Sequence, residues 1–323
     1  MAASSQAESS GNSGPHQAIP AADDRERFTE ELFDTLWEHY RKRVDYVTRY
    51  EQVIEQASAT FVNDHIAFRT FAGQAPLTGM SAISRIFEAL GYRPAGCYDF
   101  PDKHLNAIHY QHPNAEFPKI FISELKIWEL SGSVRDAIHR SIASHRDPIS
   151  AETLSRLNSL IKNPDSDWAG LLKTVVSQFH ELPWDVPEKE VVTALNEESQ
   201  YAAWVLVHGY HVNHFTSLIN SHQVESMDDI EKTVQALKDA GVPTKKNIEG
   251  ERGSKLRQSA TEAVMIDVAV QEGGQETTMP WTYAYFELAE RGTVTDPVSG
   301  KEVRFEGFLG PQATHLFEMT KLS

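Results

Sequence analysis

The chain of 323 residues is poor in cysteine, in basic residues and in long apolar runs. Its one cysteine, Cys97, excludes an internal disulfide, and no CxxC zinc pattern or nucleophile signature surrounds it. Lys and Arg number 30 against 46 Asp and Glu, and the formal charge of −16 opposes binding to nucleic acid or to an anionic membrane surface. No apolar run approaches the roughly 18 residues of a membrane-spanning helix. We therefore expect a soluble protein of a reducing compartment, most simply the cytoplasm.

A shift in composition separates the first 25 residues from the rest. They are rich in Ser, Ala and Gly, and they lack both the charged-then-apolar order of a secretion signal and the Arg content of an organelle transit peptide. We predict a disordered tail over residues 1–25, followed by one large domain over residues 26–323. That length is enough for a sizeable hydrophobic core.

Apolar residues recur at intervals of three and four in several stretches, which is the pattern of an amphipathic helix. In the first stretch Phe28, Leu32, Leu36 and Tyr40 form such a stripe, and we predict one helical region over 25–59. Glycine follows two of the other stretches, as it commonly ends helices. The remaining predicted helical stretches are 77–90 before Gly91, a helical insertion over 126–200, and 227–240 before Gly241.

Short runs of β-branched and aromatic residues predict strands between these helices. In the first half, a run at 64–71 precedes the 77–90 helix and three more runs follow it. In the second half, the stretch 201–217 has β composition, and a weak run at 242–248 follows the next helix. The other predicted strands are 96–100, 105–112 and 119–125 in the first half, and one or two within 255–270 plus 282–290 in the second.

The two halves share landmarks at matching intervals. His65, preceded by Asp64, stands 26 residues before Gly91, and His214, preceded by Asn213, stands 27 residues before Gly241. Both halves have the order β-α-β-β-β, and such a duplication argues for two similar units. We predict an α+β fold in which two β-α-β-β-β units form a shared central sheet or half-barrel, with a helical insertion and peripheral helices.

The first predicted strand carries two side chains suited to binding. Because side chains alternate along a strand, His65, Ala67 and Arg69 share one face, while Ile66 and Phe68 share the other, which is core-like. An imidazole and a guanidinium on one face could hold a metal ion beside an anion. The alternatives are an ordinary polar strand face for both residues, or a structural salt bridge for Arg69.

A pairing of the two units around a pseudo-twofold axis would bring three ligand-type residues together. His65 and His214 then occupy equivalent positions, and Glu287 ends the last strand of the second unit. Two imidazoles and one carboxylate leave coordination positions open, which suits non-haem Fe(II) better than a closed structural zinc site. An open site can bind a 2-oxo acid and then O₂, so these residues favour oxygen chemistry.

Other histidines and carboxylates compete for these roles. Glu124 matches Glu287 by its place in the repeat, and because an oxygen-activating site keeps one carboxylate, we expect one of the two to be structural. His211 falls on the opposite strand face from His214, and His208 lies far along the strand if that strand is continuous. Surface or structural roles are expected for Glu290, Glu318, His104, His109 and His112.

Motifs near the end of the chain resemble a known dioxygenase. The stretch YFELAERG at 285–292, followed by FEGF at 305–308 and LFE at 316–318, resembles the C-terminal end of 4-hydroxyphenylpyruvate dioxygenase. In that family the Glu that corresponds to Glu287 is an iron ligand.

A second resemblance extends over nearly the whole chain. The motifs HIAFRT at 65–70, LPW at 182–184 and NHFT at 213–216 resemble more specifically the DUF1338 family, the 2-oxoadipate dioxygenase/decarboxylases. That family belongs to the vicinal-oxygen-chelate superfamily, so the resemblance implies the same paired-unit fold that the repeat predicts.

The DUF1338 resemblance also implies a function. It implies His65, His214 and Glu287 as ligands of Fe(2+), and Arg69 as the residue that holds a substrate carboxylate, for which the planar fork of Arg is better suited than Lys. The implied reaction converts 2-oxoadipate and O₂ into 2-hydroxyglutarate and CO₂, a step of lysine breakdown. The single catalytic domain then consists of 26–125 (N-terminal helix and first unit), 126–200 (helical insertion) and 201–323 (second unit and C-terminal helix).

Two further expectations come with the resemblance. Gln258 matches a Gln beside the metal pocket and is expected to contact substrate or a ligand, or else to be a strand-surface amide. The segment 307–311 has the composition of a lid that excludes water. The alternative functions are a related dioxygenase acting on another 2-oxo acid and a non-catalytic small-molecule-binding module of the same fold.

Overall fold

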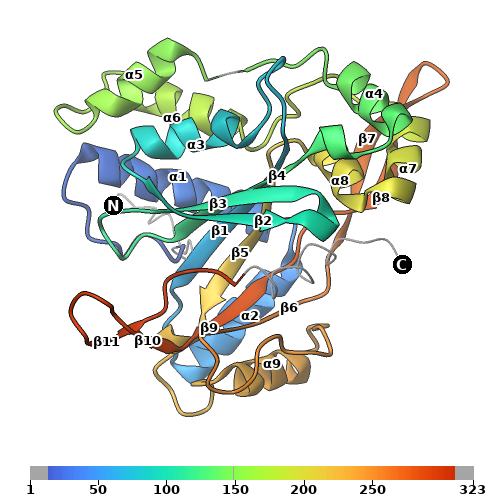
Figure 1. Ribbon diagram of the computed structural model, residues 1–323. Helices are drawn as coiled ribbons and strands as arrows, with labels where there is room; N and C mark the ends of the chain where they lie inside the picture. Colours follow the sequence, from blue (N-terminus) through green and yellow to red (C-terminus); the bar gives the residue numbers. More distant parts are fainter. Residues whose placement is uncertain (1–13, 148, 310–323) are drawn as a thin grey trace, which may run out of the picture.

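In the computed structural model, which describes residues 14–147 and 149–309, seven strands form one curled sheet (Figure 1). The two strands at its centre are antiparallel to each other, and each is parallel to its outer neighbour. The sheet therefore has two similar halves, and the predicted α+β fold with a shared half-barrel is confirmed. From one edge to the other the strands are β2 (Arg93–Phe100), β3 (Leu105–Gln111), β4 (Lys119–Leu125), β1 (Asn63–Phe71), β5 (Val212–Leu218), β9 (Glu287–Arg291) and β6 (Leu256–Ala260).

The helices that follow the two central strands match as well. α3 (Met80–Ala89) follows β1, and α9 (Ile230–Asp239) follows β5. Two residues after the end of each helix lies a glycine with positive φ, +101° at Gly91 and +75° at Gly241, a conformation that a residue without Cβ adopts at little cost. In both turns the glycine N–H and the N–H of the next residue donate to carbonyls of the last helical turn. The duplication inferred from sequence spacing is thus present in the fold.

The second half departs from the predicted strand pattern in two places. The weak run at 242–248 forms no strand and contributes only the isolated β-bridge between Thr244 and Thr261. A hairpin of β7 (Met265–Glu272) and β8 (Gln275–Thr282) is inserted before β9 and forms a sheet of its own. The strand predicted at 282–290 consequently starts later, and Glu287 begins β9 rather than ending it. A last hairpin consists of β10 (Thr293–Thr295) and β11 (Glu302–Arg304).

The N-terminal helical region is two helices rather than the one predicted. α1 (Asp24–Arg41) and α2 (Asp45–Ala57) are separated by a bend at Val44, whose backbone is non-helical and whose side chain is fully buried. The bend allows both apolar stripes to reach the core, because Trp37 of α1 and Tyr50 of α2 each pack against aromatic rings of the second half.

The tail predicted over residues 1–25 is too long. Residues 14–23 precede α1 in the described structure, and the ring nitrogens of the fully buried His16 lie 3.0 Å from Asp34 Oδ1 and 3.1 Å from Asn63 Oδ1. His16 therefore fastens this segment to α1 and to β1. The rest of the predicted tail, the predicted C-terminal helix and Glu318 lie outside the described residues.

Helices occupy the predicted insertion between the two halves. One further helix, α8 (Gln200–His208), replaces the β structure predicted from residue 201. Residues 201–207 are apolar and buried on every side, and the periodicity of such a run does not distinguish a core helix from a core strand. The helices of the insertion are α4 (Gly132–Ser141), α5 (Ala151–Ser159), α6 (Trp168–Ser177) and α7 (Lys189–Glu198).

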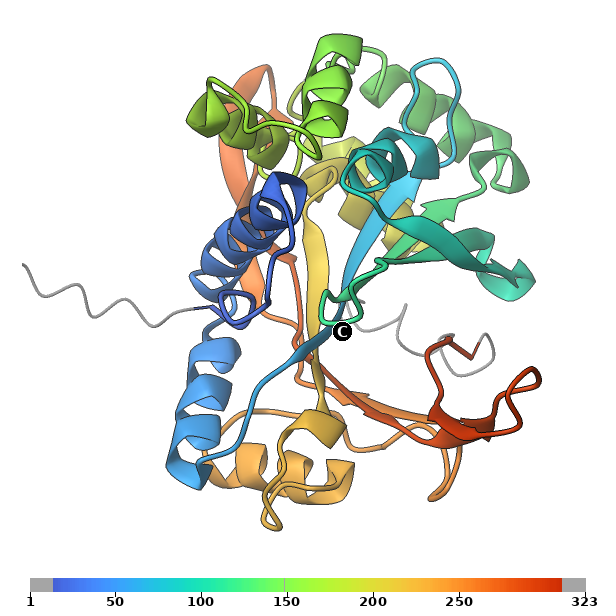
Figure 2. The same cartoon turned by 90° about the vertical axis from the view of Figure 1, so that its left-hand side faces the viewer.

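A helical layer covers one face of the sheet. α3 contacts β4, α1 contacts β5, and α9 contacts β6 and β9. Figure 2 shows α1 and α2 running along one side of the sheet, with the β10–β11 hairpin projecting from the other. The ring of Phe68 packs toward this layer, 5.5 Å from that of Phe87 in α3. His65 and Arg69 therefore face the opposite, inner side, as the alternation along the strand predicted.

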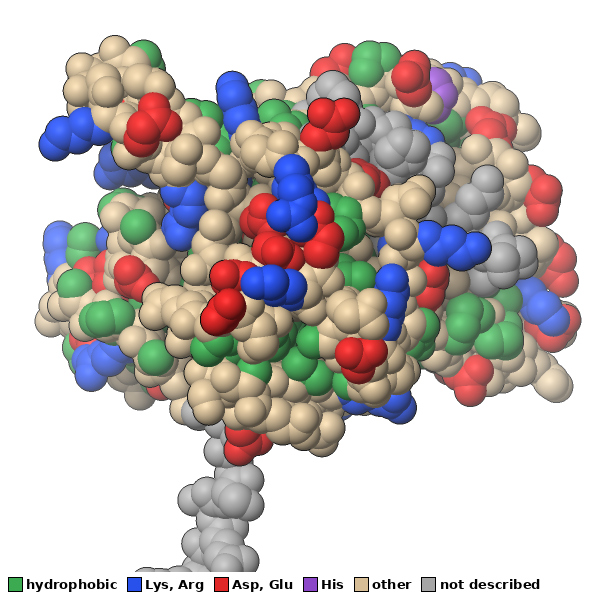
Figure 3. All heavy atoms as spheres, turned by 90° about the horizontal axis from the view of Figure 1, so that it is seen from below, with side chains coloured by type: hydrophobic (Ala, Val, Ile, Leu, Met, Phe, Trp, Pro, Cys, Tyr) green, Lys and Arg blue, Asp and Glu red, His purple; other side chains and the backbone are tan. Residues whose placement is uncertain are grey.

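Charged side chains are mixed on the face of the molecule seen from below, where Lys and Arg lie beside Asp and Glu near its centre (Figure 3). Within residues 14–147 and 149–309, no helix has the length and apolar character needed to cross a bilayer.

Candidate metal centre and substrate pocket

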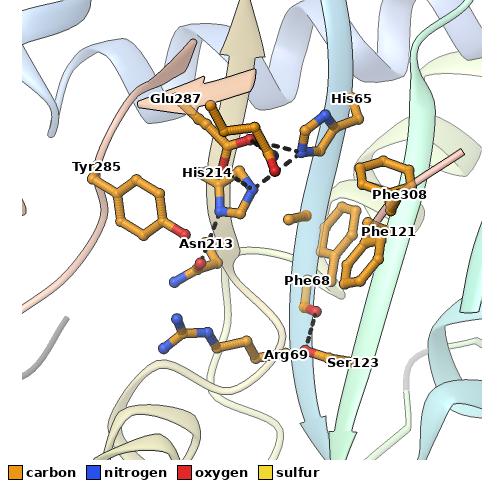
Figure 4. A pocket seen from close by; sticks show the side chains of 12 residues that line it. His65, Phe68, Arg69, Phe121, Ser123, Asn213, His214, Tyr285, Glu287 and Phe308 are labelled. Carbon is orange, nitrogen blue, oxygen red and sulfur yellow. Dashed lines mark hydrogen bonds and ion pairs between the residues drawn. The ribbon is translucent and has the colours of Figure 1, made fainter. Parts of the chain in front are cut away.

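Three side chains from three different strands meet on the inner face of the sheet (Figure 4). His65 comes from β1, His214 from β5 and Glu287 from β9, and one ligand atom of each lies within 4.8 Å of the others. The two Nε2 atoms are 3.3 Å apart, His65 Nε2 is 3.5 Å from Glu287 Oε1, and His214 Nε2 is 3.3 Å from Glu287 Oε2. Among the described residues this is the one group of three or more His, Cys, Asp or Glu side chains with such spacing.

The residue before each histidine sets the direction of its imidazole. His65 Nδ1 lies 2.8 Å from Asp64 Oδ2, and His214 Nδ1 lies 3.0 Å from Asn213 Oδ1. Since a carboxylate or amide oxygen accepts, each Nδ1 donates its proton and each Nε2 keeps a lone pair for the centre. This outer contact is the usual way in which a protein orients a metal-binding histidine.

Glu287 is fully buried, and one of its oxygens is held by an amide. Gln258 Nε2 donates to Oε1 over 2.7 Å, whereas Oε2 accepts no hydrogen bond within the described part of the chain. Burial raises the pKa of Glu287 well above its ordinary value. Burial also lowers the pKa of His65, against the opposing effect of Asp64, and together with His65 it lowers the pKa of His214 well below its ordinary value.

The geometry and the titration directions describe the same environment. Two neutral imidazoles with inward lone pairs and a buried carboxylate with one unsatisfied oxygen are what a divalent cation requires of its ligands. The donor set of two nitrogens and one oxygen leaves open coordination positions, as in the non-haem iron sites with two histidines and one carboxylate. The residues present therefore fit an Fe(II) ion.

Strand register shows how the fold creates this grouping. In the antiparallel β1–β5 pair, His65 lies opposite Thr216 and His214 lies opposite Ala67, which is the arrangement of two positions related by a twofold axis. On the outer sides, Ala67 pairs with Phe121 of β4 and Thr216 pairs with Glu287 of β9. Phe121, rather than Glu124, is thus the counterpart of Glu287.

Glu124 lies three residues after Phe121, as Glu290 lies three residues after Glu287. Glu124 is therefore the counterpart of Glu290. Glu124 Oε2 accepts from the N–H of Met80 over 2.8 Å, and Glu290 Oε2 accepts from the N–H of Ile230 over 2.8 Å. These N–H groups begin α3 and α9, where a carboxylate is favoured. The predicted match of Glu124 with Glu287 is wrong, and both Glu124 and Glu290 are structural.

A pocket extends from the three candidate ligands toward Arg69. Figure 4 places Arg69 and Ser123 at the end of the pocket away from the ligands, with Phe121 and Phe308 on one side and Tyr285 on the other. The remaining lining residues are Ala67, Phe68, Asn213 and Gln258.

Arg69 is buried among aromatic rings. Its guanidinium carbon lies 5.1 Å from the ring centre of Tyr201 and 5.2 Å from that of Trp204. Burial lowers the pKa of Arg69, and the nearby Tyr285 hydroxyl, to which it is hydrogen-bonded, opposes that shift. Because an arginine stays protonated under all ordinary conditions, this end of the pocket is positively charged.

The other candidate histidines lie away from the centre. His208 is the last residue of α8 rather than part of a strand, and its Nε2 donates to the Thr282 carbonyl over 2.8 Å. His211 Nδ1 lies 3.5 Å from Arg43 Nη1. Gln258, which sequence reasoning left open as a strand-surface amide, is buried and holds Glu287.

Some pocket residues carried no sequence signal. Phe121 and Tyr285 line the pocket, and Tyr201 packs against Arg69. Nothing in the local sequence pattern of these three residues distinguishes them from core residues. The Asp64-His65 and Asn213-His214 dipeptides were visible as a repeat, although the orienting hydrogen bonds were not inferred from them.

Comparison with known proteins gives one consistent family. A family model described as HGLS, 2-oxoadipate dioxygenase/decarboxylase, matches residues 29–303. The chain is 30% identical over 279 residues to the "2-oxoadipate dioxygenase/decarboxylase, chloroplastic/amyloplastic" of Oryza sativa subsp. japonica, an alignment that covers 80% of this chain and 68% of the relative.

Solved structures agree with this family and with the fold. The hydroxyglutarate synthase of Oryza sativa in complex with 2-oxoadipate has a TM-score of 0.74 at 26% identity, covering 94% of this chain and 97% of that one. A putative glyoxalase superfamily protein from Ralstonia eutropha JMP134 has a TM-score of 0.77 at 22% identity, covering 90% of each chain, and shows the shared fold.

Proposed function

Because the chain belongs to the 2-oxoadipate dioxygenase/decarboxylase family, we propose that it is an Fe(II) enzyme that converts 2-oxoadipate and O₂ into 2-hydroxyglutarate and CO₂. The observation that carries the proposal is the convergence of His65, His214 and Glu287 at one end of a pocket whose other end is Arg69. The reaction balances without a further reductant, because both oxygen atoms of O₂ end in 2-hydroxyglutarate. One becomes part of its new carboxylate and the other its hydroxyl.

The ion would be held by the two inward Nε2 atoms and by Glu287. Bound there, Fe(II) would supply O₂ activation and a Lewis acid for the 2-oxo acid. Asp64 and Asn213 fix the two imidazoles, and Gln258 fixes the carboxylate through Oε1, so the ligands are oriented before the ion arrives.

Arg69 is proposed to bind the distal carboxylate of the substrate. It lies four residues beyond His65 on β1, about 13 Å along an extended strand, and its side chain faces the same pocket. A 2-oxo acid with its reacting end at the ligands therefore needs a chain of several carbons before its second carboxylate reaches the guanidinium. This separation favours a longer dicarboxylic 2-oxo acid, such as 2-oxoadipate, over a shorter one.

The walls of the pocket keep water from the reacting end. Ala67, Phe121 and Phe308 present apolar groups beside the ligands, and the ring of Phe308 lies 4.9 Å from that of His65. Excluding water strengthens the electrostatic interactions in the site and protects reactive species from side reactions.

The test combines metal loading with substrate turnover. Protein reconstituted anaerobically with Fe(II) is supplied with 2-oxoadipate, 2-oxoglutarate or 4-hydroxyphenylpyruvate, and O₂ uptake, CO₂ release and 2-hydroxyglutarate are measured. We expect one CO₂ and one 2-hydroxyglutarate for each O₂ with 2-oxoadipate. Iron-loaded protein that consumes no O₂ with any of the three acids would instead be a binding module, and turnover of another acid alone would change the substrate.

A pair of histidine variants provides the matched control. His214→Ala removes a proposed ligand, so iron binding and O₂ uptake should both be lost. His208→Gln alters another buried histidine, outside the pocket, and the glutamine amide can still donate to the Thr282 carbonyl. That variant should keep iron and activity.

We also propose a reducing compartment for the protein. Its one cysteine, Cys97, is a free, exposed thiol. The name of the rice relative places that protein in plastids, so the expected cytoplasmic location is to be tested by fractionation of the source cells.

A further inference from the structure

Arg291, the last residue of β9, is buried and makes a two-point contact with Asp64. Its Nε donates to Asp64 Oδ1 over 2.6 Å and its Nη2 donates to Oδ2 over 2.8 Å. Both side chains are almost fully buried. Asp64 also accepts a hydrogen bond from His65 Nδ1, so Arg291 is linked through Asp64 to a proposed metal ligand.

The remaining terminal nitrogen of Arg291 binds the chain that follows β11. Nη1 donates to the Phe305 carbonyl over 3.0 Å and to the Gly307 carbonyl over 2.8 Å. We call residues 305–308 the strap. One guanidinium therefore joins the strap to the residue that orients His65.

The strap is fastened to the first half of the sheet on its other side. The Phe308 N–H donates to the Tyr98 hydroxyl over 3.1 Å, and Gln111 Nε2 donates to the Glu306 carbonyl over 3.3 Å. Lys119 Nζ lies 2.6 Å from a carboxylate oxygen of Glu306. These contacts set the Phe308 ring against Phe121, with ring centres 4.8 Å apart, and against His65 at the mouth of the ligand group.

The other half of the sheet has no equivalent of this connection. By the same register, Asp64 corresponds to Asn213 and Arg291 corresponds to Leu125. The group that orients His214 is therefore a neutral amide. The position that corresponds to Arg291 carries the apolar Leu125 and so no cation. The charged pair occurs only behind the histidine that the strap covers, so it is not a remnant that both units share.

We propose that Arg291 is a positioning residue that couples the closed position of the strap to the orientation of His65. The proposal rests on the proposed function, since it assigns His65 to the metal. With the strap closed, Arg291 is satisfied by two carboxylate oxygens and two carbonyls, and Asp64 is held against His65. If the strap leaves, two buried N–H groups of Arg291 lose their acceptors, and the Asp64 contact is no longer fixed from behind.

The planar fork of arginine is what makes this coupling work. Lysine carries the same charge on a single nitrogen, so at position 291 it can reach Asp64 or the strap carbonyls but cannot hold both in one geometry. Arg291→Lys therefore keeps a cation beside Asp64 and separates the coupling from simple charge neutralisation.

The first experiment measures the strap and the metal site without turnover. In Arg291→Lys we expect amide hydrogen exchange in the strap to be at least about tenfold faster, and the affinity for Fe(II), or for Co(II) followed by its visible spectrum, to fall about tenfold. Arg257→Lys is the matched control, because Arg257 is also buried and pairs with two carboxylates, Glu231 and Glu290, away from the pocket. Equal exchange and equal affinity in the two variants would overturn the proposal.

The second experiment asks whether Arg291 acts through Phe308. Phe308→Ala, Arg291→Lys and the double variant are compared by the ratio of 2-hydroxyglutarate formed to O₂ consumed. We expect each single change to lower this ratio and the double variant to lower it no further than the stronger single change. Independent, multiplying effects would show that the residue and the strap are not coupled.

Two provisions keep the result interpretable. Exchange and Co(II) binding need no substrate, so a wild-type protein that fails to turn over 2-oxoadipate would refute the proposed function and leave these two readouts in place. If Arg291→Lys does not fold, Tyr98→Phe loosens the strap from its other side by removing the acceptor of the Phe308 N–H. Unchanged strap exchange and an unchanged product ratio in Tyr98→Phe and Phe308→Ala would then refute the strap's role.

Discussion

Phe121 and Glu287 occupy the same position in the two halves of the sheet, one pairing with Ala67 across β4 and β1 and the other with Thr216 across β9 and β5. Both side chains line the pocket. The duplicated scaffold therefore offers two pairs of equivalent positions around the centre. His65, His214 and Glu287 carry the proposed ligands, and the fourth position carries a phenyl ring. In the proposed centre, this asymmetry leaves coordination positions open for a substrate and O₂.

Filling the fourth position with a carboxylate should take one of the open coordination positions of the proposed centre. In Phe121→Glu we expect metal to be retained, with a larger rise in melting temperature on metal addition than in the wild type, because two buried carboxylates repel each other without a cation. Substrate-dependent O₂ uptake should fall at least about tenfold, since one open position is taken. Phe121→Leu keeps an apolar side chain and should retain most activity. Full O₂ uptake by the glutamate variant would contradict this account.

Removing the amide that holds Glu287 should lower the affinity for the metal ion without removing a proposed ligand. In Gln258→Leu we expect the apparent affinity for Fe(II) to fall about 10- to 100-fold, the usual effect of losing an outer contact to a ligand. Activity should recover at saturating Fe(II). Gln178→Leu changes another buried glutamine, which does not line the pocket, and should leave the affinity unchanged. Equal losses in both variants would indicate a general effect on stability.

Arg69→Lys separates substrate binding from metal binding. Iron content should be unchanged, and the KM for 2-oxoadipate should rise about tenfold or more, because a lysine loses the two-point contact with a carboxylate. The comparison substrate is 2-oxohexanoate, which has the same length but lacks the distal carboxylate. The wild type should prefer 2-oxoadipate strongly, and the variant should lose most of that preference. Loss of iron in Arg69→Lys would instead make Arg69 a structural support of the ligands.

Sequence reasoning found the parts of the site that local patterns encode. The repeated Asx-His dipeptides and the glycines that end α3 and α9 have fixed spacings, so His65, His214 and the two-unit fold could be predicted. Glu287 was found as well, from its place in the second unit and from the dioxygenase motif, but its predicted match with Glu124 is three residues out of register. The strand register is set by hydrogen bonding to β1 and β5, and a short Glu-Leu match does not determine it.

The remaining features of the site, which local patterns do not encode, depend on contacts between segments that are distant in the sequence. The run beginning at Tyr201 is apolar throughout, so periodicity gave no sign that it forms α8 and brings Tyr201 under Arg69. Arg291 was visible only as a charged residue in a familiar motif. Its role follows from Asp64, 227 residues earlier, and from carbonyls of a strap whose composition suggested nothing more specific than a lid.

A cluster of histidines away from the pocket should make the apoprotein sensitive to acid. The rings of His39 and His180 stack with their centres 3.8 Å apart, and His211 lies 6.2 Å from His180. Burial, with the nearby His39 and His211, lowers the pKa of His180 to about 3, and burial likewise lowers that of His211 to about 3.

The sign of the effect follows from which state binds protons. Between the ordinary histidine pKa of about 6.5 and the folded value, these groups are protonated in the unfolded chain but neutral in the fold. The unfolding free energy should therefore be constant with respect to these groups above pH 6.5 and should fall with decreasing pH, by up to about 1.4 kcal/mol per pH unit for each histidine.

His180→Phe tests this linkage. The phenyl ring can stack on His39, and His180 Nε2 makes no hydrogen bond within the described structure, so the change removes the titrating group at little cost in contacts. Urea unfolding of the metal-free protein at pH 6.5, 5.5 and 4.5 should give a slope against pH that is shallower by up to about 1.4 kcal/mol per unit. His139→Gln alters a histidine that is exposed on α4 and should leave the slope unchanged. A wild-type slope in His180→Phe would mean that His180 has similar pKa values in the folded and unfolded chains, and the acid sensitivity would then have to come from other buried groups.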